Sequence, residues 1–125
     1  MVKILVAEDE RDIRELIAYT LMFAGYDVIQ VSNGADAVDV AVSECPDVIL
    51  MDVRMPRMTG YQACEVLKQK PETQDTPVIF LSAKGQESEI QQGLGAGAVK
   101  YILKPFAPDE LTSQVENVLK EIGKI

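Results

Sequence analysis

The chain has 125 residues, 47% of them hydrophobic, which is the length and apolar content of one domain that folds alone. A formal net charge of −8 disfavours direct nucleic-acid binding, because affinity for a phosphate backbone comes mainly from cationic side chains. Histidine is absent and the only cysteines are Cys45 and Cys64, so a zinc cluster and a disulfide framework are not indicated and both thiols are predicted to be reduced.

The first apolar run, at residues 4–7, is too short for a signal peptide or a membrane span, which predicts a soluble cytoplasmic protein with no membrane contact. Runs of similar, strand-like length recur along the chain, at residues 28–31, 48–51, 78–81 and 101–103.

Between these runs the apolar residues follow helical spacing. The first such segment carries one stripe that ends near Gly25, a plausible helix stop. Further helices are predicted over residues 35–43, 61–70, 86–97 and from Pro108 onward. The segment 86–97 is predicted to be the weakest and most mobile helix, because it contains three glycines and each disfavours helix by about 1 kcal/mol relative to alanine.

This alternation predicts five β-α units in one domain, residues 1–125. Continuous apolar strands such as residues 48–51 imply a parallel sheet that is buried on both faces, with helices on either side. The predicted class is therefore a doubly wound α/β fold.

Polar residues follow four of the predicted strands. In an open parallel sheet, ligands bind beyond the carboxyl ends of the strands, so these residues are expected to meet in one crevice. Taken singly, Asp9 or Glu10 could instead cap the next helix, Ser82 could cap a helix or stabilise a turn, and Lys104 could be an unpaired surface lysine. The residues after the strands are Glu8, Asp9 and Glu10, then Asp52, then Ser82, and finally Lys104 with Pro105.

Asp52 is the hardest of these residues to explain structurally. It ends a hydrophobic strand at the centre of the sheet, where an ionised carboxylate needs a partner. If Glu8 and Asp9 approach it to about 4 Å, each like-charged pair would repel by about 4 kcal/mol at an effective dielectric constant near 20, which calls for a cation. A set of oxygen ligands without histidine or thiolate favours Mg²⁺, with Mn²⁺ as a substitute ion.

A carboxylate nucleophile, a divalent cation, a lysine and a hydroxyl form a set suited to phosphoryl transfer. In that interpretation Asp52 is the phosphoacceptor. Lys104 and the Ser82 hydroxyl stabilise the phosphoryl oxygens.

These motifs together resemble the receiver domains of two-component response regulators, over essentially the whole chain. The resemblance rests on five features in order: Glu8-Asp9, the run from Leu50 through Asp52 to Gly60, Ser82-Ala83, Gly97-Ala98 leading to Tyr101, and Lys104-Pro105-Phe106. It implies a flavodoxin-like (βα)5 sheet with strand order 2-1-3-4-5.

The resemblance also implies roles for individual residues. Asp9, Asp52 and the backbone carbonyl of Arg54 would hold the metal, with Glu8 acting largely through water. The Lys104-Pro105 bond would be cis.

The same resemblance implies partners and a switch. Asp52 would take its phosphoryl group from a phosphohistidine of a sensor histidine kinase or phosphotransfer protein. Movement of Ser82 and Tyr101 would then switch the face around the fourth helix, fifth strand and fifth helix, for a downstream protein or a homodimer. From the sequence alone, an aromatic residue in a strand, such as Tyr101, is more often simply packed against its neighbours. The chain would catalyse its own phosphorylation and autodephosphorylation without being a conventional turnover enzyme.

Three alternatives stand beside this interpretation. A haloacid-dehalogenase-type phosphatase would need a second aspartate two residues after Asp52, where the chain has Arg54. A flavodoxin-like flavin-binding module would place its phosphate beside the acidic Glu8-Asp9-Glu10 run. The third is a receiver-fold module that binds proteins without being phosphorylated.

Overall fold

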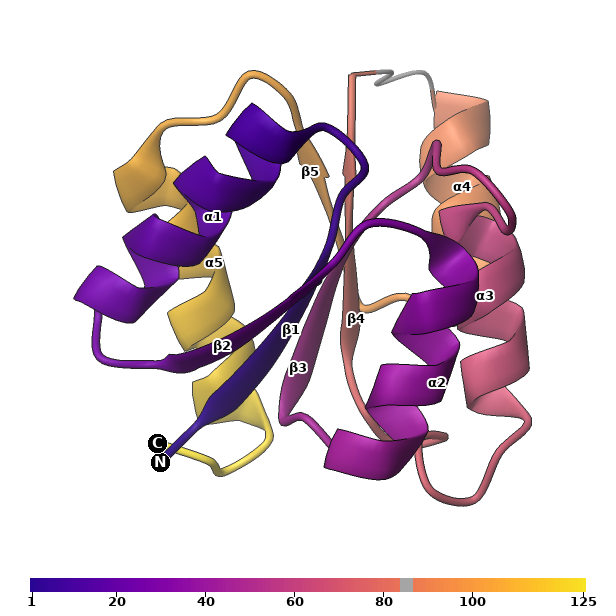
Figure 1. The fold of residues 1–125 in the computed structure, drawn as a ribbon, viewed down its shortest axis with the longest axis horizontal. Coiled ribbons are helices and arrows are strands. Elements are labelled where there is room, and N and C mark those ends of the chain that lie inside the picture. Colours follow the sequence, from indigo (N-terminus) through magenta and orange to yellow (C-terminus); the bar gives the residue numbers. More distant parts are fainter. Residues whose placement is uncertain (84–86) are drawn as a thin grey trace.

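Five parallel strands form one sheet in the order β2-β1-β3-β4-β5 in the computed structural model, which describes residues 1–83 and 87–125 (Figure 1). This confirms the predicted fold class and strand order. Both ends of each strand lie within one residue of their predicted positions. The strands are β1 Lys3–Ala7, β2 Asp27–Val31, β3 Val48–Asp52, β4 Val78–Ser82 and β5 Lys100–Leu103.

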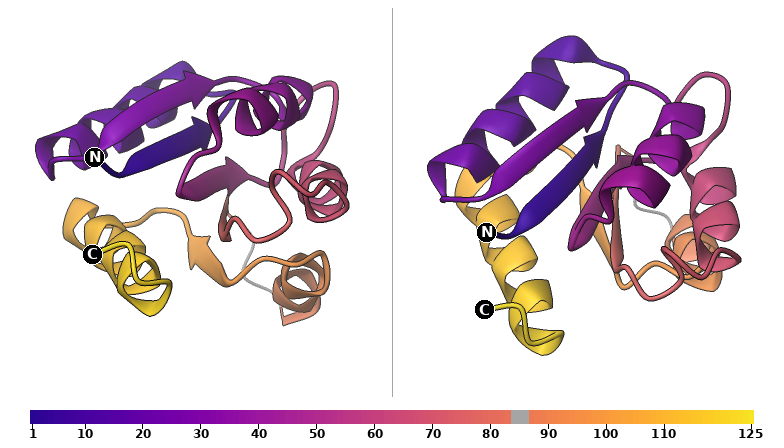
Figure 2. Two further views of the ribbon diagram at one scale, coloured as in Figure 1. Left: turned by 90° about the horizontal axis from the view of Figure 1, so that it is seen from below. Right: turned by 60° about the horizontal axis from the view of Figure 1, so that its bottom comes forward.

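A helix follows each strand, and the helices cover both faces of the sheet. Two of them, α1 and α5, lie on one face, and the other three lie on the opposite face (Figures 1 and 2). The helices are α1 Arg11–Phe23, α2 Gly34–Glu44, α3 Gly60–Lys68, α4 Glu87–Gly95 and α5 Pro108–Glu121.

The core is divided in two by the sheet, because successive strand residues point to opposite faces. Leu5 and Ile49 pack in the cluster under α2, α3 and α4, whereas Ile4 and Leu50 pack in the cluster under α1 and α5. Every residue of β3 and β4 is buried, as predicted from their continuous apolar runs. The central strands are therefore fixed on both sides, and the residues at their ends are held in place by the core.

Local signals explain where two helices begin. The Asn33 side chain accepts a hydrogen bond from the backbone of Asp36 at the start of α2. Thr59 and Gln62 form a capping box at the start of α3. Glu10 stands at the N-cap position of α1, but its side chain makes no capping hydrogen bond. The alternative that Glu10 serves as a side-chain helix cap is therefore wrong.

The fourth helix ends earlier than predicted. Gln86, where the prediction began, lies outside the described residues, and α4 ends at Gly95 rather than at Gly97. Gly97 follows the helix with a φ of 109°, a left-handed conformation that glycine adopts without steric cost. Gly93 lies inside the helix, and a Cβ there would come 3.0 Å from the Phe80 ring and 3.1 Å from the Tyr101 ring. This glycine therefore permits close packing between α4 and two aromatic rings.

Both cysteines are free thiols, as predicted, but their environments differ. Cys45 is exposed, whereas Cys64 is buried and donates to the carbonyl of Ala96, and burial raises its pKa to about 11. Because the thiolate is the reactive form, we expect iodoacetamide at pH 8 to alkylate one thiol of the native protein quickly and the second only after denaturation. Mass spectrometry of wild type and of Cys45→Ser checks this. Rapid native labelling of Cys45→Ser would contradict it.

Within residues 1–83 and 87–125, none of the helices combines the length and the apolar character that crossing a bilayer requires.

Candidate functional site

The register of the sheet brings four strand ends to the same edge. Ala7 pairs with Met51, so the residues that follow them, Glu8 and Asp52, lie at the same level of β1 and β3. Ser82 pairs with Leu103, which places Lys104 at the end of β5, and the Lys104 amide donates to the Ser82 carbonyl at 2.8 Å. The predicted convergence of the polar strand ends is thus present.

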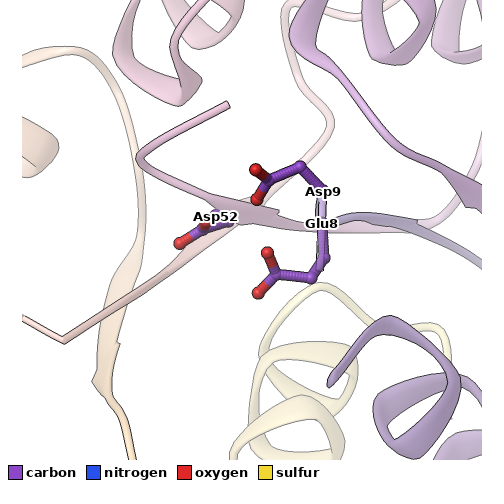
Figure 3. A group of neighbouring side chains, drawn as sticks. All are labelled: Glu8, Asp9 and Asp52. Atoms are coloured by element: carbon purple, nitrogen blue, oxygen red, sulfur yellow. The ribbon is translucent and has the colours of Figure 1, made fainter. Parts of the chain in front are cut away.

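Three carboxylates gather at this edge. Glu8, Asp9 and Asp52 each offer an oxygen, and these oxygens lie within 4.8 Å of one another (Figure 3). Glu8 is fully buried, Asp52 is 7% exposed and Asp9 is exposed. This close grouping of like charges is the arrangement for which the sequence predicted a cation.

Lys104 supplies the positive charge beside this group. Its Nζ donates to Glu8 Oε1 and, at 3.3 Å, to Asp52 Oδ1. Its side chain is only 15% exposed, so the ammonium group is largely removed from water. The alternative that Lys104 is an unpaired surface lysine is wrong. The peptide bond between Lys104 and Pro105 is cis, as the family resemblance implied.

The buried groups have shifted proton affinities. Burial raises the pKa of Glu8 to about 7, because desolvation disfavours its charged form; the hydrogen bond from Lys104 opposes this and the charge of Asp52 adds to it. Burial by itself would lower the pKa of Lys104, but the hydrogen bond to Glu8 and the charge of Asp52 outweigh burial and raise it. Lys104 is therefore a permanent cation at neutral pH, whereas Glu8 titrates there.

These donors fit a hard divalent cation. The three side chains offer carboxylate oxygens, without histidine or thiolate, and Asp9 is open to solvent on one side. Mg²⁺ prefers such sites, because it is usually bound by one or two carboxylates and keeps several waters.

A cavity of about 560 Å³ opens over the site. Its lining includes the polar residues Asp9, Asp52, Ser82 and Lys104. It also includes apolar residues, which are Ile13, Leu16, Pro105 and Phe106. A phosphorylated group could therefore reach Asp52 from solvent while an apolar surface of its carrier packs beside it.

Arg54 also lines this cavity, in the loop that joins β3 to α3. The base of the loop is closed, because the Gly60 amide donates to the Val53 carbonyl at 2.8 Å. A Cβ at Gly60 would lie 2.3 Å from the Asp52 carbonyl oxygen, so only glycine allows this approach. The role of Gly60 was not predicted from the sequence, where the Thr59-Gly60 pair at the start of α3 was the available signal.

Of the two predicted switch residues, Ser82 lies at the cavity and Tyr101 lies outside it. Ser82 ends β4, is 5% exposed, and borders the cavity with Asp52. Tyr101 is half-buried, and its ring centre lies 6.4 Å from that of Phe80 at an interplanar angle of 62°. Tyr101 thus packs beside α4 and does not line the cavity.

The model of the response regulator receiver domain matches residues 4–116, and the chain belongs to that family. It is therefore a receiver domain of the kind found in two-component systems. The match also sets aside the haloacid-dehalogenase and flavin-binding alternatives.

Individual relatives agree with this assignment. The chain is 42% identical over 120 residues to the phosphate regulon transcriptional regulatory protein PhoB of Pseudomonas aeruginosa, covering 96% of this chain and 52% of PhoB. It spans about half the length of the curated relatives that it matches.

Solved structures share the fold closely. The chemotaxis protein CheY4 of Vibrio cholerae superposes with a TM-score of 0.91 at 33% identity, covering 95% of this chain and 99% of CheY4. The receiver domain of the sensor histidine kinase PA1611 of Pseudomonas aeruginosa has a TM-score of 0.87 at 32% identity, covering 93% and 95% of the two chains. That structure has a magnesium ion coordinated in the active-site cleft.

Proposed function

We propose that this chain is a phosphorylated receiver domain in which Asp52 accepts a phosphoryl group from a phosphohistidine of a sensor histidine kinase or phosphotransfer protein. The observation that carries the proposal is the position of Asp52: it is a nearly buried carboxylate beside a lysine ammonium and two further carboxylates, and it lines a cavity. An aspartate with only a structural role would not need this combination.

In the transfer, an oxygen of Asp52 forms a bond to phosphorus while the phosphorus–nitrogen bond of the phosphohistidine breaks. The imidazole nitrogen leaves with the bonding electron pair. The Lys104 ammonium group, 3.3 Å from Asp52 Oδ1, stabilises negative charge on the phosphoryl oxygens, and the Ser82 hydroxyl donates to another oxygen.

Asp9, Asp52 and the backbone carbonyl of Arg54 would hold Mg²⁺, with Glu8 acting through water. When bound, Mg²⁺ offsets the charge of the carboxylates and of the phosphoryl oxygens. Support comes from the carboxylate donor set and from the magnesium coordinated in the receiver domain of PA1611. Mn²⁺ offers similar oxygen preference and is proposed as a substitute.

The output is proposed to pass through the face formed by α4, β5 and α5, to a downstream protein or a second copy of the chain. Tyr101, beside α4, and Ser82 would change position when Asp52 is phosphorylated. The net charge of −8 favours a protein target over direct contact between these residues and DNA. The transcriptional role named for PhoB belongs to a protein of which this chain covers half.

Incubation with acetyl phosphate, with and without Mg²⁺, tests the proposal. We expect wild type to gain the mass of one phosphoryl group in the presence of Mg²⁺ and to lose it in mild base, because acyl phosphates hydrolyse there. Removal of Mg²⁺ with a chelator should slow the gain by at least about 100-fold, since charge neutralisation provides most of the catalysis.

Asp52→Asn is the matched control, because it is isosteric and lacks the nucleophile. It should gain no phosphoryl mass. A wild type that stays unmodified would favour the remaining alternative, an interaction module that is never phosphorylated. Equal modification of Asp52→Asn would show that the acceptor is another residue.

A further inference from the structure

The first turn of α2 packs directly against the β3–α3 loop, residues 53–59. Gly34, the first residue of α2, is buried against Met58 of this loop. A Cβ built on Gly34 would lie 2.2 Å from the Met58 carbonyl oxygen and 2.8 Å from its carbonyl carbon. These are backbone atoms, which cannot rotate away as a side chain could, so a larger residue at position 34 must displace the loop or the helix.

A second contact joins the same two segments. The Arg57 Nη1 atom lies 3.5 Å from Asp36 Oδ1, across the junction between the loop and α2. The other carboxylate oxygen of Asp36 accepts from the side chain of Asn33 at 2.9 Å. Because Asn33 also caps α2 through the Asp36 amide, the carboxylate that meets Arg57 is oriented by the helix start itself.

The tip of the loop, Arg57 and Met58, has a backbone conformation that the contacts with α2 stabilise. Arg57 has a φ of 69°, in the left-handed region that costs a residue with a Cβ about 1 kcal/mol or more. The Met58 amide bonds to the Pro56 carbonyl at 2.8 Å, which tightens the turn at this point. The contacts with α2 fall on Arg57 and Met58, the two residues at this turn.

The base of the loop, in contrast, is fixed by the sheet. The Val53 amide donates to the Leu81 carbonyl at 3.2 Å, and Gly60 closes the loop against Val53 and Asp52. Arg54 stands between this fixed base and the tip. The segment that joins Arg54 to the tip is therefore the part of the loop that would absorb a displacement of Arg57 and Met58.

We propose that Gly34 is a positioning residue for phosphoryl transfer: its lack of a side chain lets the first turn of α2 hold the β3–α3 loop so that the Arg54 carbonyl faces the metal site beside Asp52. The inference rests on the proposed function, because it assigns Gly34 a role toward the Mg²⁺ of that site. Gly34 acts only through the loop and does not itself contact the site.

The test compares Gly34→Ala with Gly95→Ala. Both replace a helical glycine by alanine, but a Cβ at Gly95 meets no atom within 4 Å. Calorimetric titration with MgCl₂, at a temperature where each variant is folded by circular dichroism, should show Mg²⁺ binding about tenfold weaker in Gly34→Ala, the effect typical of residues that orient a metal ligand. Gly95→Ala should match wild type.

The Mg²⁺ affinity of the folded protein separates this role from a purely structural one. If Gly34 only stabilised the fold, Gly34→Ala would have a lower melting temperature and an unchanged Mg²⁺ affinity, and that result would overturn the inference. If wild type itself bound no Mg²⁺, the proposed function would fail instead.

A second pair of variants serves if Gly34→Ala does not fold. Asp36→Asn removes the carboxylate that meets Arg57, whereas Asp39→Asn makes the same charge change at an exposed position of α2. Asp36→Asn should bind Mg²⁺ about two- to threefold more weakly than Asp39→Asn, in line with the strength of a single exposed ion pair. Equal affinities in these two variants would also overturn the inference.

Discussion

Lys104→Met is expected to slow phosphorylation by acetyl phosphate at least about 100-fold, the usual cost of removing one preorganised group that stabilises developing charge. Methionine fills a similar volume but carries no ammonium group. Lys104 Nζ is the cation that donates to both Glu8 and Asp52, so its loss removes the charge beside the phosphoacceptor. The rate is measured by intact-mass analysis at saturating Mg²⁺.

The same variant should lose stability in a manner that depends on pH. Breaking a buried ion pair by removing one partner costs about 3–5 kcal/mol while the remaining charge stays ionised. Glu8 is fully buried and escapes this cost by taking up a proton. We therefore expect the free energy of unfolding of Lys104→Met to fall further below wild type at pH 8 than at pH 5, as measured by urea denaturation without metal.

Lys100→Met is the matched control. Lys100 begins β5, the strand that Lys104 follows, so the change in net charge is identical and lies at the far end of the strand. Its phosphorylation rate should equal that of wild type. A rate in Lys104→Met equal to that of Lys100→Met would mean that the lysine beside Asp52 has no part in the transfer.

The sheet and its polar edge could be predicted because both follow from short-range patterns. Each apolar run is itself a strand, and parallel strands direct their carboxyl ends to one edge, so Asp52, Ser82 and Lys104 had to meet once the fold class was known. The direct pairing of Lys104 with Glu8, 96 positions apart, was not predicted, because β1 and β5 are separated by two strands and the contact depends on the reach of the lysine side chain.

The close backbone contacts could not be predicted in this way. Gly34 approaches Met58, and Gly93 approaches Phe80 and Tyr101, at distances that depend on how whole helices pack on the sheet. In the sequence, Gly93 indicates only a weaker helix, since its intrinsic propensity is visible and its packing partner is not. The full burial of Glu8 could not be predicted either, because an acidic residue after a strand is normally exposed.

Glu8 makes the stability of the metal-free protein depend on pH. Its pKa rises from 4.5 in the unfolded chain to about 7 in the fold, so the folded state binds the proton more tightly. The resulting stabilisation is fully present below pH 4.5 and is lost as pH rises through 7, a difference of about 3 kcal/mol over this window at 1.4 kcal/mol per pH unit. Other carboxylates also make the free energy of unfolding depend on pH. The contribution of Glu8 is therefore measured as the difference in the free energy of unfolding between wild type and Glu8→Gln.

Mg²⁺ binding should show the opposite dependence on pH. A cation favours the ionised form of Glu8, so binding below pH 7 must displace the proton, and the apparent affinity should rise by up to about tenfold per pH unit until Glu8 is ionised. Calorimetry in two buffers of different ionisation enthalpy measures the protons released. We expect release to approach one proton near pH 6 and to vanish near pH 8.5.

Glu10→Gln is the control for this effect, because Glu10 is an exposed carboxylate two residues from Glu8. It should retain the proton release of wild type, whereas Glu8→Gln should bind Mg²⁺ without releasing a proton. Proton release that persists in Glu8→Gln would assign the titration to another group. If Glu8 is the titrating group, lowering the pH from 7.5 to 6.5 would lower Mg²⁺ occupancy and phosphoryl transfer together, because protonation of Glu8 removes a negative charge beside the metal site.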